Sequence, residues 1–373
     1  MIQEEELEMK PLDPHKSDAP LDRFLPSVGV APGGALFDGS RAMLTRQWTR
    51  RGFLRAVALG GATLVTAPLA SPFGVTSAVA ATGAQDFTFA VLADSHTMGN
   101  RNPVMKLRLE AAIRQINALN PAPDFVMYLG DAIHDGTPEQ FKYFAEIIAG
   151  LKPPVYFLAG EHDWYLDMGE YYLDRFIRRP APYYSLDHKG AHIIALHGSN
   201  LNDFWTVRRL TPEERMHIAG TVNDIGQGPF LLGKAQLDWI EKDLAKVPKD
   251  TPLLVFSHTP LYRYFRPWNL WIEDAEEIQA LLKPFKTVQV FHAHVHHLVE
   301  HAIGNIRFHG ALATSWPHPY PDTYHTLGLQ GQMPRSNPAN LFDGLGWQRG
   351  KVAARGAVTH EDILWTLAPP SIS

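Results

Sequence analysis

The sequence predicts an α/β layered domain, because short apolar runs alternate with amphipathic stretches from residue 85 onward. The apolar runs that we expect to be strands are 87–93, 125–129, 155–158, 191–196, 253–256 and 288–291. Helical periodicity appears between them at 104–119, 234–247 and 274–282. Thr137 and Pro138 predict one more helix start, as the cap and the first helical residue.

No long linker interrupts this alternation, so residues 81–373 are expected to form a single domain. Two stretches depart from the rhythm, at about 199–232 and at about 315–355, the second of which is rich in Pro, Gly and Trp. We expect both to be irregular insertions, and long irregular loops within compact domains commonly serve function.

Composition narrows the chemistry that the chain can perform. It has 373 residues, a formal net charge of −5 and no cysteine. A disulfide scaffold, a thiolate zinc site and a cysteine nucleophile are therefore excluded, and a metal would be held by His, Asp, Glu or Asn. The acidic balance disfavours a nucleic-acid partner. After residue 85 we find no apolar stretch long enough to span a membrane.

The first 80 residues have the pattern of an export signal. Arg50 and Arg51 precede an apolar run at 56–70, small residues at 78–80 offer a cleavage site, and 43–80 hold four arginines and no acidic residue. This order predicts a twin-arginine signal peptide at 43–80, the twin-arginine translocation machinery as a partner, and a periplasmic or secreted mature protein. The alternative is a buried helix that begins with two arginines.

Residues 1–42 are acidic, rich in Pro and Gly, and without periodicity. We expect them to be disordered, either as an extension of the leader or because the start codon is misplaced. Met43 would be a more usual start for such a signal.

Asp, Glu or His side chains follow five of the predicted strands. They form the segments Asp94-Ser95-His96, Gly130-Asp131, Gly160-Glu161-His162-Asp163, Ser257-His258 and His292-Ala293-His294-Val295-His296. Each segment alone has an ordinary explanation: a turn, a surface histidine or a His-rich edge. Together they predict a metal site where the strands end.

In this order the segments resemble the motifs of the calcineurin-like metallophosphoesterases: Asp-x-His, Gly-Asp, Gly-Asn-His-Asp/Glu, His and Gly-His-x-His. The resemblance covers about residues 86–312. It implies a four-layer αββα sandwich of two mixed sheets flanked by helices. It also implies hydrolysis of phosphate esters, as phosphatase or phosphodiesterase, with two metal ions above the strand ends.

The resemblance also implies a role for each matching residue. The first metal would be held by Asp94, His96 and His296, the second by Glu161, His258 and His294, and Asp131 would bridge the two. His162 matches the family's substrate-facing histidine and Asp163 the acidic residue beside it, which makes them the expected catalytic pair. His292 has no counterpart and is expected to be structural.

Two such ions, about 3.5–4 Å apart, would share a hydroxide as nucleophile, so no protein nucleophile is required. A protonated His162 would neutralise charge that develops on a phosphate oxygen. The expected substrate is a small phosphate ester. The sequence does not name the ions: manganese, iron and zinc all suit this donor set.

Glu161 departs from the family pattern, which has Asn at this position. The extra carboxylate would bring the centre with its hydroxide to neutrality, whereas Asn would leave one positive charge. We therefore expect a centre that favours a monoanionic diester or an unusual substrate. The alternative is a catalytically degenerate protein of the periplasm that keeps its metal for binding or assembly.

Overall fold

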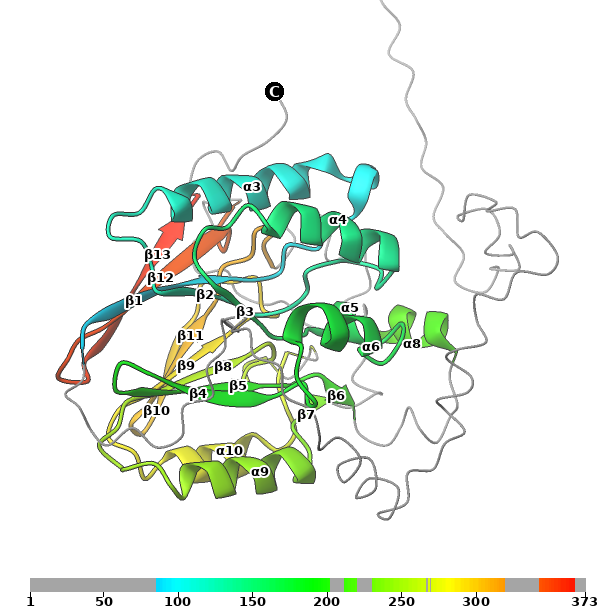
Figure 1. Ribbon diagram of the computed structural model, residues 1–373. Helices are drawn as coiled ribbons and strands as arrows, with labels where there is room; N and C mark the ends of the chain where they lie inside the picture. The colour runs from blue at the N-terminus through cyan, green and yellow to red at the C-terminus, as the bar shows by residue number, and fades with distance from the viewer. Residues whose placement is uncertain are drawn as a thin grey trace, which may run out of the picture. The chain divides into compact units, whose positions relative to one another are not determined.

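The computed structural model describes residues 85–201, 211–219, 230–265, 268, 270–318 and 342–365. Within these residues two mixed β-sheets face each other and helices cover their outer sides (Figure 1). The order of layers is helix, sheet, sheet, helix, as predicted. The predicted export signal and the segment before it lie outside the described residues.

The first sheet has the strand order β13 (Val358–Leu364), β12 (Gly346–Val352), β1 (Phe87–Leu92), β2 (Phe125–Tyr128) and β3 (Val155–Phe157). β1, β2 and β3 are parallel, and β12 is antiparallel to β1. β1 is apolar on both faces because helices cover one side of the sheet and the second sheet covers the other.

The second sheet has the strand order β10 (Glu300–Ile303), β11 (Ile306–Gly310), β9 (Val288–His292), β8 (Leu253–Ser257), β5 (Ala191–Leu196) and β4 (Tyr184–His188). Its four central strands are parallel, so their carboxyl ends lie at one edge. A short ribbon joins β6 (Asn200–Leu201) to β7 (Phe230–Leu231).

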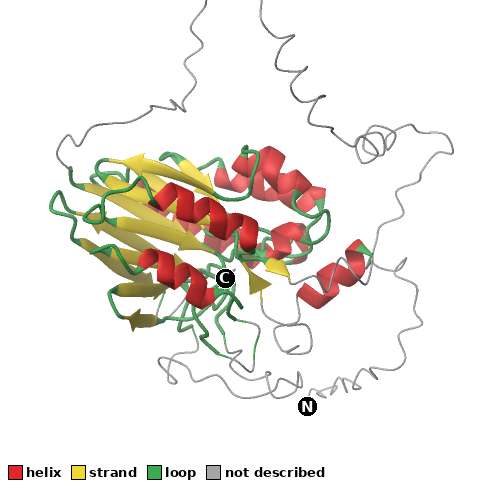
Figure 2. Ribbon diagram, turned by 90° about the horizontal axis from the view of Figure 1, so that it is seen from below, coloured by secondary structure: helices red, strands yellow, loops and turns green. Residues whose placement is uncertain are grey.

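Helices α3 (Pro103–Asn117) and α4 (Pro138–Ile148) cover the first sheet, and α9 (Lys234–Leu244) and α10 (Ala275–Leu282) cover the second (Figures 1 and 2). Shorter segments are α5 (Glu161–Trp164), α6 (Glu170–Tyr172), α8 (Pro212–Ala219), η2 (Gly99–Arg101) and η3 (Leu173–Ile177). The Thr137 side chain accepts a hydrogen bond from the Gln140 backbone N–H, which confirms the predicted cap. None of the helices in the described ranges is both long and apolar enough to cross a bilayer.

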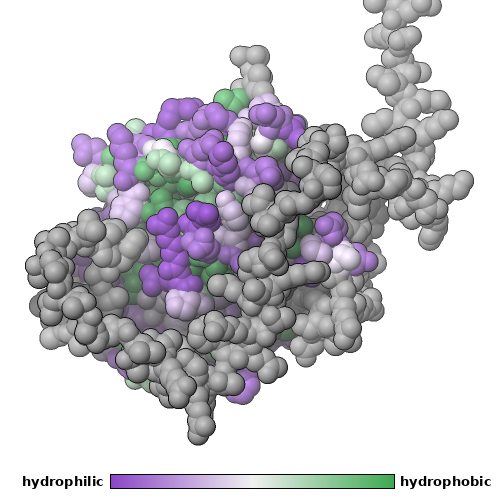
Figure 3. All heavy atoms as spheres, turned by 45° about the vertical axis from the view of Figure 1, so that its right-hand side comes forward, coloured by the Kyte–Doolittle hydropathy of each residue, from purple (hydrophilic) through white to green (hydrophobic). Residues whose placement is uncertain are grey.

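Aromatic rings join the two sheets. Phe89 of β1 stacks on Phe125 of the same sheet, with ring centroids 5.5 Å apart. It also meets Phe256 and Phe291 of the other sheet edge-on, at 5.8 and 5.4 Å. All four rings belong to the buried core, and the described part of the face in Figure 3 shows hydrophilic side chains around a smaller hydrophobic patch.

The structure corrects the expected extent of the second insertion. Residues 346–352, within the stretch expected to be irregular, form β12 beside the central strand β1. Its glycines hid the strand in the sequence. Close packing against the adjacent strand explains why residue 350 is a glycine. Gly350 pairs with Phe89, and a Cβ at this position would lie 2.1 Å from the Phe89 ring. The first expected insertion contains β6, α8 and β7, and the remainder of both stretches lies outside the described residues.

We predict that Gly350→Ala lowers the free energy of unfolding by about 1–3 kcal/mol, because an added methyl group overpacks the core against Phe89. Denaturant titration measures the change. The double variant Phe89→Leu, Gly350→Ala should show a favourable coupling energy, since the smaller partner relieves the clash. Strictly additive losses in the two single variants would contradict this account.

Candidate metal centre

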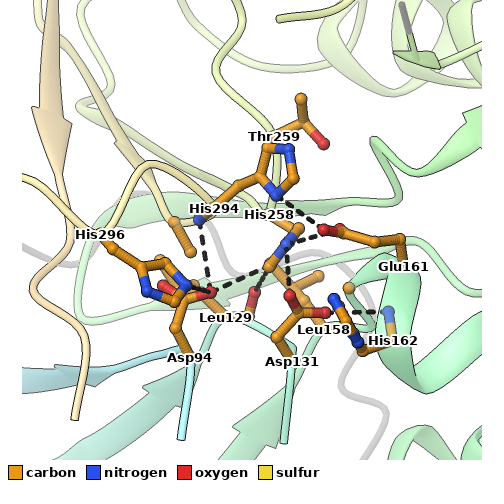
Figure 4. Close-up of polar contacts among 12 residues, drawn as sticks. Asp94, Leu129, Asp131, Leu158, Glu161, His162, His258, Thr259, His294 and His296 are labelled. Carbon is orange, nitrogen blue, oxygen red and sulfur yellow. Dashed lines mark hydrogen bonds and ion pairs between the residues drawn. The ribbon is translucent and has the colours of Figure 1, made fainter. Parts of the chain in front are cut away.

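The strand-end segments converge at one edge of the two sheets (Figure 4). Their side chains form two neighbouring groups, and within each group the ligand atoms lie within 4.8 Å of one another: Asp94, His96 and His296 in the first, and Asp131, Glu161, His258 and His294 in the second. These are the seven residues that the family resemblance assigns to the metals, and Asp131, the expected bridge, falls in the second group. All seven are at most 3% exposed.

Asp131 lies between the two groups. Its Oδ2 is 3.4 Å from His96 Nε2 in the first group and 3.5 Å from His258 Nε2 in the second. Oδ1 accepts a hydrogen bond of 3.0 Å from the His162 backbone N–H, which fixes the carboxylate plane. This position is the one that a bridging ligand requires.

Two histidines are oriented by backbone carbonyls behind them. His258 Nδ1 donates to Leu129 O at 2.7 Å, and His296 Nδ1 donates to Trp316 O at 2.7 Å. Each donation places the lone pair of the neutral ring on Nε2, which faces the carboxylates. A carbonyl partner of this kind is the usual support for a metal-bound histidine.

The backbone is strained where it presents these side chains. Asp94, His96, Asp131, His294 and His296 have positive φ, from 41° to 67°, and they are five of the eight such non-glycine residues in the described ranges. Left-handed backbone is uncommon for residues other than glycine, although Asp and His tolerate it better than most, and it gathers at functional sites. Here it occurs at the turns that follow β1, β2 and β9.

Two glycines let the second and third turns approach each other. A Cβ on Gly130 would lie 2.3 Å from Gly160 N, and a Cβ on Gly160 would lie 2.1 Å from Asp131 Oδ1. Any larger residue at either position would push Asp131 and Glu161 apart. The glycines of the Gly-Asp and Gly-Glu-His-Asp segments therefore set the spacing of the two carboxylates.

The electrostatics of the group call for cations. Asp94, Asp131 and Glu161 are three carboxylates at 0–2% exposure, and Asp94 Oδ2 has no hydrogen-bond partner. Burial alone would raise the pKa of Glu161, but His294 and His258 outweigh it and hold that pKa well below its usual range. Buried carboxylates that stay ionised are paired or coordinate a metal, and this donor set fits two metal ions.

Glu161 contacts both histidines of the second group. Its Oε2 is 2.9 Å from His258 Nε2 and its Oε1 is 2.8 Å from His294 Nδ1. His294 Nε2 is buried without a hydrogen-bond partner, as expected of an atom available for a metal.

The predicted catalytic pair has two different environments. His162 donates from Nδ1 to the backbone carbonyl of His134 at 2.5 Å, and its ring lies edge-on to the His96 ring at 4.7 Å. Burial lowers the pKa of His162, but Asp131 and Glu161 more than reverse this and leave it raised. The two carboxylates thus favour the protonated form of His162 relative to a histidine buried without them.

Asp163 turns away from this space. Its Oδ2 accepts the Gly160 backbone N–H and its Oδ1 accepts that of Ala132, both at 3.0 Å. The carboxylate thereby ties the turn after β3 to the turn after β2. These contacts are those of a positioning residue, so its expected role as a catalytic group remains a prediction.

The sequence did not reveal two neighbours of the first group. The His134 ring stacks on the His162 ring at 4.9 Å, and the Trp316 ring lies 4.4 Å from the His96 ring. His134 follows Asp131 by three residues, where the motif comparison assigns no ligand, and Trp316 lies in the expected insertion. His292, expected to be structural, is fully buried and belongs to none of the candidate ligand groups of the described residues.

Comparison with known proteins agrees with this geometry. The family model "Calcineurin-like phosphoesterase" matches residues 87–298, which is more than half of the chain. The chain belongs to the calcineurin-like phosphoesterase family. It is therefore a metal-dependent phosphoesterase, and the matched region contains all nine predicted site residues.

Its relatives carry phosphodiesterase names. A probable cyclic nucleotide phosphodiesterase of Rhodopseudomonas palustris is 26% identical over 59% of this chain and 76% of its own length. A 3′,5′-cyclic-nucleotide phosphodiesterase of Nostoc is 21% identical over 62% of this chain and 77% of its own length. A probable glycerophosphodiester phosphodiesterase of Arcobacter nitrofigilis is 29% identical over 40% of this chain and 46% of its own length.

Among solved structures, a dimetal phosphatase from Danio rerio has a TM-score of 0.50 and 13% identity, and the match covers 74% of this chain and 98% of that one. At this identity the likeness shows the shared fold alone. It confirms the predicted sandwich of two mixed sheets with flanking helices.

We predict that Mn²⁺ raises the melting temperature of the chelator-treated protein and that Asp131→Asn removes most of this rise, because Asp131 lies between both ligand groups. Saturation at a thousand times Kd stabilises a protein by about 4 kcal/mol, a shift of several degrees. The control is His292→Asn, a strand-end histidine outside both groups. A full Mn²⁺ response in Asp131→Asn would contradict the bridging assignment.

Proposed function

We propose that the chain hydrolyses phosphodiesters, with small cyclic or glycerol-linked diesters as the substrate class, at a centre of two metal ions. The observation that carries the proposal is the meeting of two ligand groups at Asp131, whose carboxylate also accepts a hydrogen bond from the His162 backbone N–H. The phosphodiesterase names of the relatives support the substrate class.

When bound, two divalent ions supply Lewis acidity, which activates a water molecule and polarises the phosphate. The remaining work belongs to the side chains. His162 is fixed by the His134 carbonyl at Nδ1, so its Nε2–H is the proton it can donate to a phosphate oxygen as negative charge develops. Asp163 holds the two turns that carry Asp131 and His162 at a constant spacing.

Glu161 supplies the preference for a diester. Compared with Asn it reduces the positive charge of the centre by one unit, and it contacts both His258 and His294. A less positive centre attracts a dianionic monoester less strongly, whereas a monoanionic diester loses less. The same reduction favours release of the more highly charged monoester product.

We predict that Glu161→Asn lowers the ratio of diester to monoester hydrolysis, because the restored positive charge favours the dianionic monoester over the monoanionic diester. The measurement compares kcat/KM for bis(p-nitrophenyl) phosphate and p-nitrophenyl phosphate with matched metal loading. Glu161→Gln is the control that removes the charge but keeps the side-chain length. An unchanged ratio of diester to monoester hydrolysis in the Asn variant would contradict the tuning.

We predict that His162→Ala lowers kcat for the diester by about 10²–10⁴-fold, the usual contribution of a positioned proton donor. Metal content should be unchanged, because His162 belongs to neither of the two groups of this centre that contain a carboxylate. Its only candidate ligand group among the described residues consists of three histidines, His96, His134 and His162. If the wild-type protein with two metals hydrolysed no phosphate ester, the alternative of a degenerate binding or assembly protein would replace the enzyme.

We also propose that the protein is exported by the twin-arginine machinery through residues 43–80. Support comes from Arg50-Arg51, the apolar run at 56–70 and the small residues at 78–80. Export after folding would let the metals be loaded in the cytoplasm, which favours manganese or iron over zinc or copper chosen by affinity alone.

We predict that the double variant Arg50→Lys, Arg51→Lys stays unprocessed inside the cell when expressed in a host with this machinery. Fractionation and immunoblotting measure the distribution. Arg23→Lys and Arg41→Lys, outside the predicted signal, form the matched control. Equal export of all variants would contradict the proposal.

A further inference from the structure

A separate cluster of side chains that can bind a metal ion lies away from the strand-end turns. It consists of Glu300 on β10, His309 on β11 and His360 on β13, and its ligand atoms lie within 4.8 Å of one another. None of the three belongs to the centre around Asp131. β10 and β13 are the edge strands of the two different sheets.

Ring contacts connect this cluster with both sheets. The His309 ring lies 4.8 Å from the ring of Phe291, which in turn meets the ring of Phe89 of the opposite sheet. The His360 ring, from that opposite sheet, is 4.1 Å from the His309 ring. His309 is 5% exposed, whereas the Glu300 side chain is 50% exposed and can move.

Gln289 sets the tautomer of His309. Its Oε1 lies 2.6 Å from His309 Nε2, so Nε2 carries the hydrogen and donates it. In the neutral ring the Nδ1 lone pair then points at Glu300, whose Oε1 and Oε2 are 3.0 and 2.8 Å away. A lone pair that faces a carboxylate at this distance is repulsive unless a cation or a proton lies between them.

The distances suit a small metal ion after a slight opening. Zinc ligands at about 2.0–2.2 Å in a tetrahedron stand roughly 3.3–3.5 Å apart. His309 and His360 are 2.8 and 3.0 Å from Glu300, so the carboxylate has to retreat by a few tenths of an ångström, and its exposure allows this. Asp362 Oδ2 is 4.0 Å from His360 Nε2, and Gln348 holds the other oxygen of Asp362 at 2.7 Å.

We propose that Glu300, His309 and His360 form a structural site for a divalent cation of the zinc type, with Asp362 or water completing it. Two imidazoles and a carboxylate are a donor set that zinc favours. The ion would fasten β10 and β11 of one sheet to β13 of the other at the open edge of the sandwich. The site is separate from the phosphoesterase centre and does not depend on its activity.

The test uses the full chain and zinc itself. After equilibration with limiting free Zn²⁺, His360→Ala should hold one equivalent less zinc than the wild type, because it lacks one of the three ligands. Its apparent affinity for that ion should fall by more than 100-fold, since the loss of a mere supporting partner already costs about 10–100-fold. The control is His301→Ala, a histidine on the same strand as Glu300 but outside the group.

Thermal unfolding gives the second readout. Zinc should raise the melting temperature of wild type and His301→Ala in two steps, and only one of these steps should remain in His360→Ala. The hydrolysis of bis(p-nitrophenyl) phosphate by His360→Ala should be unchanged. Glu300→Gln provides a second ligand variant if His360→Ala fails to fold. Equal zinc content and equal zinc response in all folded variants would overturn the proposal. The contacts of Glu300 with His309 and His360 would then be ion pairs in which a proton takes the place of the metal.

Discussion

Three carboxylates, those of Asp94, Asp131 and Glu161, are buried together among imidazoles, and the architecture around them follows from this arrangement. Ionised groups taken out of water need compensating charge, and each loses several kcal/mol of hydration that only close partners restore. The five parallel strands that precede these turns bring the partners to one edge of the two sheets. Left-handed turns then aim the side chains across short distances.

The rigidity of the centre comes from groups that touch no substrate. Backbone carbonyls fix His258 and His296, and Asp163 joins two turns through backbone N–H groups. Gly130 and Gly160 set how closely the turns approach. Such support matters because a site with buried like charges has several arrangements of similar energy unless its ligands are held from behind.

The strand ends and the ligand set could be predicted because each motif follows an apolar run and carries hard or imidazole donors in a fixed order. The apolar runs at 191–196 and 253–256 are β5 and most of β8. Two edge strands escaped prediction: β10 is exposed throughout and β13 carries four consecutive polar residues at 359–362, so neither has an apolar signature. β12 was hidden because the glycine at 350 is required by packing against Phe89, which is distant in sequence. The stacking of His134 on His162 likewise depends on two turns meeting, which no local pattern states.

Metal content per chain tests the central claim most directly. Elemental analysis is done on the wild type and on an Asp131→Ala variant, both taken from the protein's own host. The difference in chelator-sensitive metal between them counts the ions that depend on the bridging carboxylate. The account requires two equivalents of manganese, iron or zinc that Asp131→Ala loses together, because both ligand groups meet at that residue. One equivalent or none in the wild type would contradict a centre in which Glu161 is a ligand to the second ion.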